Sequence, residues 1–182
     1  MDLAEWKQRI EEARKGKDWF LGNHPQSPLP AGERRGFGGL EYFPLDRVYR
    51  FELPLHEHEI RETIETGDTA GQTRTLWRWG EFRFSMGGQD CSLQAYKSGP
   101  GEERLFVPFR DQTSGKETYG AGRYLDLEPA RHLNSEGRWI VDFNEAYNPW
   151  CAYSEDYACP FVPPENWLQA PVHAGERSYE HG

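Results

Sequence analysis

The chain has 182 residues, which predicts one domain over residues 1–182 with a core that buries roughly two-thirds of the unfolded chain's surface. Its 30 acidic and 21 basic residues give a formal net charge of −9. This balance excludes a general nucleic-acid-binding surface, because such surfaces depend on an excess of lysine and arginine.

No stretch approaches the roughly 18 consecutive apolar residues of a membrane span, and the N-terminal residues lack the apolar core of a signal peptide. Three cysteines are an odd number for a disulfide framework. We therefore expect an acidic, soluble, cytoplasmic protein that binds neither nucleic acid nor membranes.

The N-terminal residues predict a helix over residues 2–16. Its apolar residues recur in steps of three and four, on one helix face: Leu3, Trp6, Ile10 and Ala13. Asp2 can cap the N-terminus together with Glu5, and Gly16 can end the helix. The next residues are rich in proline and glycine, so we expect a loop over residues 22–39.

From residue 45 the apolar residues recur with a period of two, as in β-strands. The alternating segments are residues 48–53, 59–66, 73–79, 81–86, 91–96, 104–109, 119–127 and 138–143. Turn residues separate them at 67–71, Gly80, 87–90 and 98–103. We predict a mainly β fold: an antiparallel β-barrel over residues 45–143, split-barrel-like in one version, or a sandwich. The proline-rich residues 144–177 should pack across it as an irregular belt.

Residues 111–118, DQTSGKET, resemble a phosphate-binding loop superficially. The match fails because an arginine stands where that loop needs its first glycine, and a glutamate follows the lysine. A strand-to-strand turn is the favoured interpretation, with Asp111 and Ser114 bonded to local backbone and Gly115 at positive φ.

His56 and His58 are two residues apart, so on a strand both could hold a metal ion from one side. Their neighbours are acids in a turn-like segment, and a solvated loop is the favoured interpretation. No metal site is predicted.

Cys151 and Cys159 lie eight positions apart among tyrosines, acids and prolines. A zinc site would need Cys91 and His173 to join them from distant positions. A disulfide is sterically feasible, but a reducing cytoplasm disfavours it. A catalytic thiolate needs a lowered pKa, which acidic neighbours oppose. Those neighbours in the sequence are Glu145, Glu155 and Asp156. We favour two buried structural thiols where the belt meets the barrel.

A set of polar residues falls at strand ends and in the belt, where side chains can converge on one mouth of a barrel. The candidate ligand-binding residues are Arg110, Asp111, Tyr119, Arg123, Asp142, Asn144, Tyr147, Asn148 and Cys151. Barrel mouths are common ligand sites, and two arginines suit a carboxylate or phosphate. In the alternative, Arg110 and Arg123 pair with Asp111 and Asp142 in a buried network that anchors the belt.

Three blocks of sequence carry a family resemblance: GLEYFPLDRVYRF, FVPFRDQTSGKETYGAGRYLDL and WIVDFNEAYNPWCAYSEDYACPFVPPENW. From about residue 19 to residue 176 the chain resembles domain of unknown function family 1684, found in bacteria and archaea. The resemblance marks these residues as family hallmarks: Arg110, Asp111, Thr113, Gly115, Tyr119, Gly120, Arg123, Tyr124, Asp142, Asn144, Asn148 and Cys151. It implies no activity, because the family has none assigned. Phe161 and Val162 depart from the CPLPP pattern of other members.

The leading functional hypothesis is a small-ligand-binding β-barrel module that accepts an anionic organic molecule or cofactor at its mouth. The cofactor is not identified, and flavin enters by analogy alone, because some flavin-binding folds are split barrels.

Two further hypotheses stay open. A hydrolase or thiol-dependent enzyme would use Asp142 or Asp111 as general base and Cys151 as nucleophile. A protein-interaction module would dock a partner on the Trp6 face of the helix and on the proline belt. A homodimer through the barrel edge or the helix is also compatible with the sequence.

Overall fold

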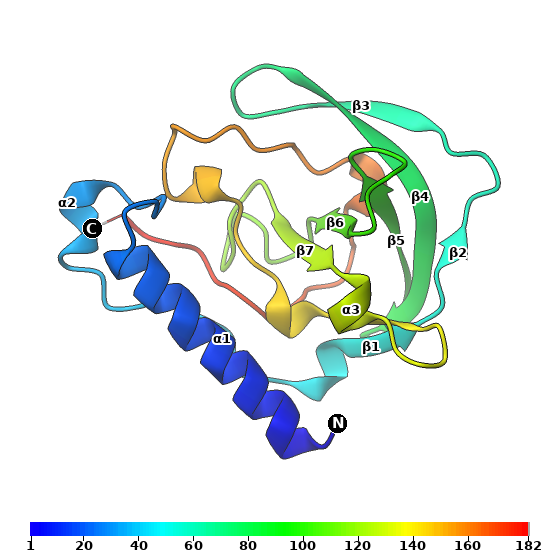
Figure 1. Cartoon of the computed structure of the whole chain (residues 1–182), viewed down its shortest axis with the longest axis horizontal. Helices are drawn as coiled ribbons and strands as arrows, with labels where there is room; N and C mark the ends of the chain where they lie inside the picture. The colour runs from blue at the N-terminus through cyan, green and yellow to red at the C-terminus, as the bar shows by residue number, and fades with distance from the viewer. Residues whose placement is uncertain (182) are drawn as a thin grey trace.

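The computed structural model describes residues 1–181 and contains two antiparallel sheets and a long N-terminal helix, α1 (Leu3–Asn23) (Figure 1). The larger sheet has the order β2-β4-β5-β6-β7, and β3 also pairs with β4. Its strands are β2 (His56–Glu57), β3 (Thr63–Gly67), β4 (Thr73–Met86), β5 (Gln89–Lys97), β6 (Leu105–Phe109) and β7 (Arg123–Leu127). The smaller sheet pairs β1 (Arg50–Leu53) with β8 (Trp139–Asp142). The mainly β fold class with an N-terminal helix is confirmed.

Short helical segments connect these elements. They are α2 (Ala31–Arg34), α3 (Pro129–His132) and the 3-10 turns η1 (Arg47–Tyr49), η2 (Phe143–Glu145), η3 (Trp150–Ala152) and η4 (Pro164–Asn166). The loop expected over residues 22–39 thus begins later and contains α2. Across residues 1–181, every helix is too short or too polar to cross a membrane.

The strands do not close into a barrel. Within residues 1–181 no ladder of hydrogen bonds joins β7 back to β2, β3 or β4. The long β4–β5 ribbon instead curves around one side of the molecule, with the β1–β8 pair at one end of it and α1 on the opposite side (Figure 1). The predicted barrel is therefore not confirmed, and the curved sheet leaves a side for α1 and the belt to cover.

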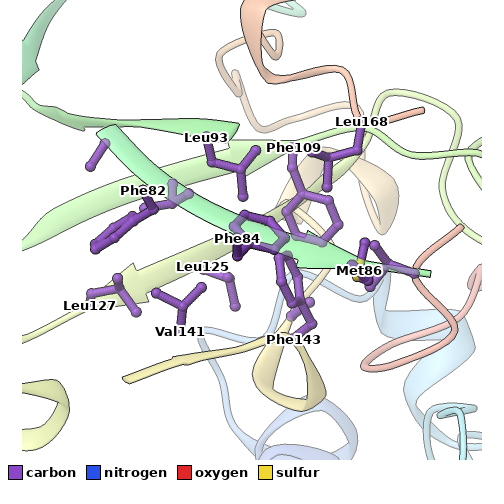
Figure 2. Packing of buried hydrophobic residues seen from close by; sticks show 14 of the residues in the cluster. Phe82, Phe84, Met86, Leu93, Phe109, Leu125, Leu127, Val141, Phe143 and Leu168 are labelled. Carbon is purple, nitrogen blue, oxygen red and sulfur yellow. The ribbon is translucent and has the colours of Figure 1, made fainter. Parts of the chain in front are cut away.

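The main core lies inside the curve of β4 and β5, and Figure 2 shows its central side chains. Alternate β4 residues point inward, as the period of two predicts: Phe82, Phe84 and Met86. The ring of Phe143, just after β8, lies 5.9 Å from Phe84 and 5.1 Å from Phe109, centroid to centroid. This residue thereby joins the small sheet to the large one.

Helix α1 begins as predicted but continues past Gly16. The Asp2 carboxylate accepts a hydrogen bond from the Glu5 amide (2.8 Å), and the Glu5 carboxylate accepts one from the Asp2 amide (3.2 Å). A glycine inside a helix costs only about 1 kcal/mol relative to alanine. Burial of Leu21 in a second small core offsets that cost, so the predicted end at residue 16 is wrong.

The turn predicted at Gly80 is also wrong, because residues 73–86 form one strand, β4. Its register with β5 shifts between Arg78 and Gly80, which is a β-bulge. A Cβ on Gly80 would lie 2.8 Å from Leu55 Cδ1 and 2.9 Å from the His56 carbonyl oxygen. The glycine therefore permits the close approach of β2 and a bend in the ribbon.

Other predicted turns are confirmed. The turn predicted over residues 87–90 is a two-residue connection, Gly87 and Gly88 at φ 60° and 76°, because β5 already begins at Gln89. Gly115 has φ 81°, and the Asp111 amide donates to Ser114 Oγ (3.1 Å), as expected for DQTSGKET. The strand expected over residues 119–127 begins only at Arg123, because residues 119–122 form a turn.

Residues 144–177 wrap irregularly across the sheets, as predicted for the belt (Figure 1, yellow to red). The buried side chain of Asn166 fixes this segment to two strands. It accepts a hydrogen bond from the Gln94 amide (2.8 Å) and donates to the Gln94 carbonyl (3.0 Å) and the Pro108 carbonyl (2.8 Å). The belt is therefore attached to the sheet by specific polar contacts as well as by apolar packing.

Candidate functional site

Arg123 and Asp111 form a buried ion pair. Arg123 Nη2 donates to Asp111 Oδ2 at 3.0 Å, and the two side chains are 0% and 1% exposed. The guanidinium also donates to belt carbonyls: Val172 (2.9 Å), Glu176 (3.1 Å) and Ala174. Arg123 and Asp111 therefore form the buried network of the alternative interpretation, in which the pair anchors the belt.

Asp142 is buried too, but its partners are not arginines. It accepts hydrogen bonds from Trp6 Nε1 (2.8 Å) and from the backbone and side-chain amides of Asn144 (2.9 and 2.8 Å). Burial raises the pKa of Asp142, although these hydrogen bonds work to lower it. The carboxylate thus links α1 to the end of β8.

The other predicted residues lie at separate places. Arg110 stacks on Trp167, with 4.5 Å between its Cζ and the ring centroid. The Tyr119 hydroxyl lies 3.6 Å from Cys151 Sγ. Asn148 is buried and donates its side-chain amide to a belt carbonyl at 2.9 Å. The structure therefore distributes these side chains over several contacts instead of one shared mouth.

A cavity of about 320 Å³ lies between α1 and the edge formed by β7, α3 and η2. We call it the α1 cavity. Its lining residues are Ile10, Ala13, Arg14, Lys17, Tyr42, Leu125, Asp126, Leu127, Glu128, Arg131, His132, Asn144, Glu145, Ala146, Tyr147 and Glu176. Its volume is typical of small-molecule sites, which combine apolar walls with a few directed polar groups. Of the predicted residues, Asn144 and Tyr147 line it, and the Tyr147 hydroxyl donates to Asp126 (2.5 Å).

Arg14 is the basic residue of the α1 cavity that lacks an ion pair within the described residues, since Lys17 and Arg131 both have one. It donates to the carbonyls of Asn144 (3.1 Å) and Phe43 (3.4 Å) and stacks on the Tyr42 ring, 4.3 Å from the centroid. Among residues 1–181 no carboxylate forms an ion pair with it, and its buried Nε atom has no hydrogen-bond partner. Burial lowers the pKa of Arg14, against the attraction of nearby negative charges. An anion in the cavity would stabilise this half-buried cation.

The opposite wall of the α1 cavity is formed by α3 and η2. His132 Nδ1 accepts from the Glu128 amide (3.0 Å), so its Nε2 proton points to Glu145 Oε2 (3.1 Å). Arg131 donates to the other oxygen of Glu145 at 2.8 Å. Within the described residues, the Glu128 carboxylate has no hydrogen-bond partner. This wall therefore includes one exposed acid, Glu128, that is not paired with another described side chain.

Arg14 and Lys17 were missed from the sequence, where the helix was interpreted only as amphipathic. A signal was present: the residues of the buried stripe continue at the same spacing through both basic residues, from Ile10 to Leu21. Basic residues on the buried face of a helix predict either an internal ion pair or a ligand site. Lys17 has the first role, since its ammonium pairs with Glu176.

The thiol expectations need two corrections: Cys151 is half-buried instead of buried, and its pKa is lowered instead of raised. Cys91, Cys151 and Cys159 are all free, and the Cys159 Sγ accepts a hydrogen bond from the Cys151 amide (3.3 Å). The sequence predicted that nearby acids raise the pKa of Cys151. Hydrogen bonds from the Cys159 thiol and the Tyr119 hydroxyl instead lower it, against the effect of burial. Acidic residues close in sequence are not the groups that act on this sulfur.

A second cavity of about 430 Å³ lies between the large sheet and the segment from α3 to β8, lined by Trp79, Trp139 and Leu133 among others. Arg61 and Lys97 stack on Trp79, with 4.1 and 3.9 Å between their charged groups and the ring centroid. The aromatic wall of this cavity is therefore already occupied by the protein's own cations.

His56 and His58, which were predicted to lie together in a solvated loop, have different surroundings. His56 is exposed on β2, whereas His58 Nε2 contacts Gln94 Oε1 at 2.7 Å. Within residues 1–181 no group of three or more His, Cys, Asp or Glu side chains is arranged to hold a metal ion.

A model of the family described as "Protein of unknown function (DUF1684)" matches residues 35–177. The chain belongs to this family. The DUF1684 match contains the buried Arg123–Asp111 pair and one wall of the α1 cavity, but α1 lies before it.

One solved structure is similar over almost the whole chain. It is the solution NMR structure of an uncharacterized protein from gene locus rrnAC0354 of Haloarcula marismortui, 40% identical, with a TM-score of 0.73. The match covers 96% of this chain and 95% of that one, so it extends beyond the region matched by the DUF1684 model. No curated protein matches this DUF1684 chain.

Proposed function

We propose that this protein is a small-molecule-binding module whose site is the α1 cavity, and that its ligand is an organic anion. The observation that carries the proposal is Arg14, a half-buried guanidinium that lines a cavity of about 320 Å³ without an ion-pair partner among residues 1–181. A charge in such a site interacts strongly with a bound anion, because screening by water is reduced.

The remaining charges of the cavity limit the ligand further. Acidic residues of the lining are largely engaged: Glu145 by His132 and Arg131, and Asp126 by Tyr147. Glu128 is the acid without a partner within the described residues. A ligand that directs a carboxylate or phosphate to Arg14 and an amine or hydroxyl to Glu128 would satisfy both side chains.

The test uses a variant that fills the cavity. Purified protein would be screened by thermal shift against carboxylates and phosphates, flavin cofactors included, and the best ligand would be measured by calorimetry. Ala13 is exposed on α1 at the cavity edge, and Ala13→Trp should abolish binding without unfolding the protein. Ala4→Trp, on an exposed position of the same helix outside the cavity, is the matched control and should bind normally.

A charge variant tests the role of Arg14. Loss of a charge-assisted hydrogen bond typically costs about 1.5–3 kcal/mol, so Arg14→Gln should weaken binding about tenfold or more. Lys15→Gln, at an exposed neighbouring position, should leave the affinity unchanged. The proposal is wrong if no anion stabilises the wild-type protein, or if Ala13→Trp binds as tightly as wild type.

The two rival hypotheses lose support from the geometry. Asp111 and Asp142 are bonded to Arg123 and Trp6, and neither carboxylate is hydrogen-bonded to Cys151 in the described residues. Trp6 itself is only 2% exposed, so the helix face proposed for docking a partner is buried. Neither a hydrolase nor an interaction module is therefore the function that the geometry supports best.

A further inference from the structure

Cys151, inside η3, and Cys159, in the loop after it, lie together although they are eight positions apart in sequence. The Cys159 Sγ is 3.3 Å from the Cys151 backbone nitrogen, which is attached to the same Cα as the Cys151 side chain. A sulfur at that position is within the range from which rotation of the Cys151 side chain can bring two sulfurs into bonding contact.

The surrounding residues hold this arrangement in place. Thr69, in the turn between β3 and β4, accepts a hydrogen bond from the Cys159 amide at its Oγ1 atom (3.1 Å) and donates its own amide to the Cys159 carbonyl (3.1 Å). Tyr119 places its hydroxyl 3.6 Å from Cys151 Sγ. The two thiols are therefore positioned by two separate parts of the chain.

The two thiols are not equivalent. Hydrogen bonds from Cys159 and Tyr119 lower the pKa of Cys151. The pKa of Cys159 is raised by the hydrogen bond that Cys159 forms with Cys151 and by burial. Cys151 is half-buried, and Cys159 is buried. A partly accessible thiol with a lowered pKa beside a buried second thiol is the arrangement found in redox-reactive cysteine pairs.

The third cysteine serves as an internal comparison. Burial raises the pKa of Cys91, whose Sγ donates to the carbonyl of Gln89 (3.6 Å) and whose side chain packs against the main core. Cys91 is half-buried like Cys151, so a difference in reactivity between the two would reflect their chemical surroundings.

We propose that Cys151 and Cys159 form a redox-active dithiol that reduces peroxides, with Cys151 as the attacking thiol and Cys159 as the resolving one. The Cys151 thiolate attacks one oxygen of the peroxide, the O–O bond breaks, and the leaving oxygen departs as an alcohol or water after it takes up a proton. The product is a sulfenic acid on Cys151. The Cys159 thiol then displaces its hydroxyl group, so that an S–S bond forms and one water leaves. Two thiols are thereby oxidised and one peroxide is reduced.

The test follows the oxidation of the full-length protein by hydrogen peroxide. After reduction and removal of the reductant, wild-type protein should lose two hydrogen atoms by intact mass, and peptide mapping should find the Cys151–Cys159 disulfide. In Cys159→Ser the reaction should stop at a sulfenic acid on Cys151, which dimedone traps. Trapping should occur at least about tenfold faster than at Cys91, since a thiolate reacts and a thiol does not.

Two variants complete the experiment. Cys91→Ser should form the disulfide at the wild-type rate, whereas Tyr119→Phe, which removes one hydrogen bond from the Cys151 sulfur, should slow trapping several-fold. The proposal is overturned if Cys151 in folded Cys159→Ser reacts no faster than Cys91, or if oxidised wild type contains no Cys151–Cys159 bond. Because the α1 cavity contains neither cysteine, either result leaves the proposed ligand site untouched.

Discussion

At the scale of single residues, what decides the role of a charge is whether the fold already supplies its partner. Arg123 and Arg14 are both withdrawn from water, yet Arg123 has a carboxylate and several carbonyls, while Arg14 contacts carbonyls and an aromatic ring. The sequence pointed to Arg123 because it lies at a strand end near the expected barrel mouth, and the family resemblance marks it as a hallmark. Only the folded structure shows that its hydrogen bonds are already used within the protein.

The Arg123–Asp111 pair should be important for stability. In Asp111→Asn the buried guanidinium would lose its counter-charge, and breaking a buried pair in this way typically costs about 3–5 kcal/mol. Urea unfolding would measure the difference. Asp156→Asn, at an exposed position, is the control and should change the free energy of unfolding by less than about 0.5 kcal/mol. A loss below 1 kcal/mol for Asp111→Asn would show that the pair does not anchor the belt.

Glu145 should make stability depend on pH. Burial works to raise the pKa of Glu145, but the hydrogen bond from His132 and the charge of Arg131 outweigh it and lower the pKa below 4.5. Stability from a lowered carboxyl pKa is complete above the unfolded value and is lost as pH falls through the folded value. Wild type should therefore exceed Glu145→Gln in stability at pH 7, and the difference should shrink steadily below pH 4.5.

Chemical denaturation of both proteins between pH 7 and pH 3 would check this dependence. Glu128→Gln, one position before α3, is the control, and its free energy of unfolding should change with pH in parallel with that of wild type. A stability difference between wild type and Glu145→Gln that is constant with pH would contradict this account. The ionised Glu145 carboxylate would then not stabilise the fold through its contacts with His132 and Arg131.

At the scale of elements, the predictable features were those set by short-range rules. The capping box at Asp2, the Gly87–Gly88 connection and the alternation of β4 follow from local sequence, and the structure has all three. Gly16 and Gly80 were misinterpreted because their effect depends on distant residues. Buried contacts beyond Gly16 extend the helix, and β2 approaches Gly80 from outside β4.

Asn166 should be the residue that joins the belt to the sheet. Within the described residues, strands β5 and β6 pair in register only at Tyr96 and Phe106. Where this pairing is missing, the side chain of Asn166 forms hydrogen bonds with both strands. Asn166→Ala would leave buried backbone groups without partners, at about 1–3 kcal/mol each. We expect a loss of about 3 kcal/mol or more.

Hydrogen exchange of the Gln94 amide, together with urea unfolding, would measure the effect of Asn166→Ala. That amide should lose protection more than amides at the β4–β5 connection. Gln169→Ala, at an exposed belt position, should change neither quantity. If the Gln94 amide stayed protected in Asn166→Ala, the side chain would not be the link between these strands.

At the scale of the whole molecule, the α1 cavity forms from segments that are far apart in sequence. Residues of α1, of β7 and α3, and of η2 meet because Trp6 bonds to Asp142 and because the curved sheet leaves that side open (Figure 1). Sequence reasoning placed Asn144 and Tyr147 near a ligand site, but it could not place the helix against them. The expected barrel mouth needed closed strands, and the ladders do not close within residues 1–181.

The most direct test of the account is an NMR titration of the full chain with the tightest-binding anion from the screen. We predict that the shifted amides cluster at residues 10–17, 125–132 and 144–147, and that Ala13→Trp abolishes the shifts while Ala4→Trp does not. Shifts centred on the second cavity around Trp79 and Trp139, or the same shifts in Ala13→Trp, would contradict a ligand site beneath α1.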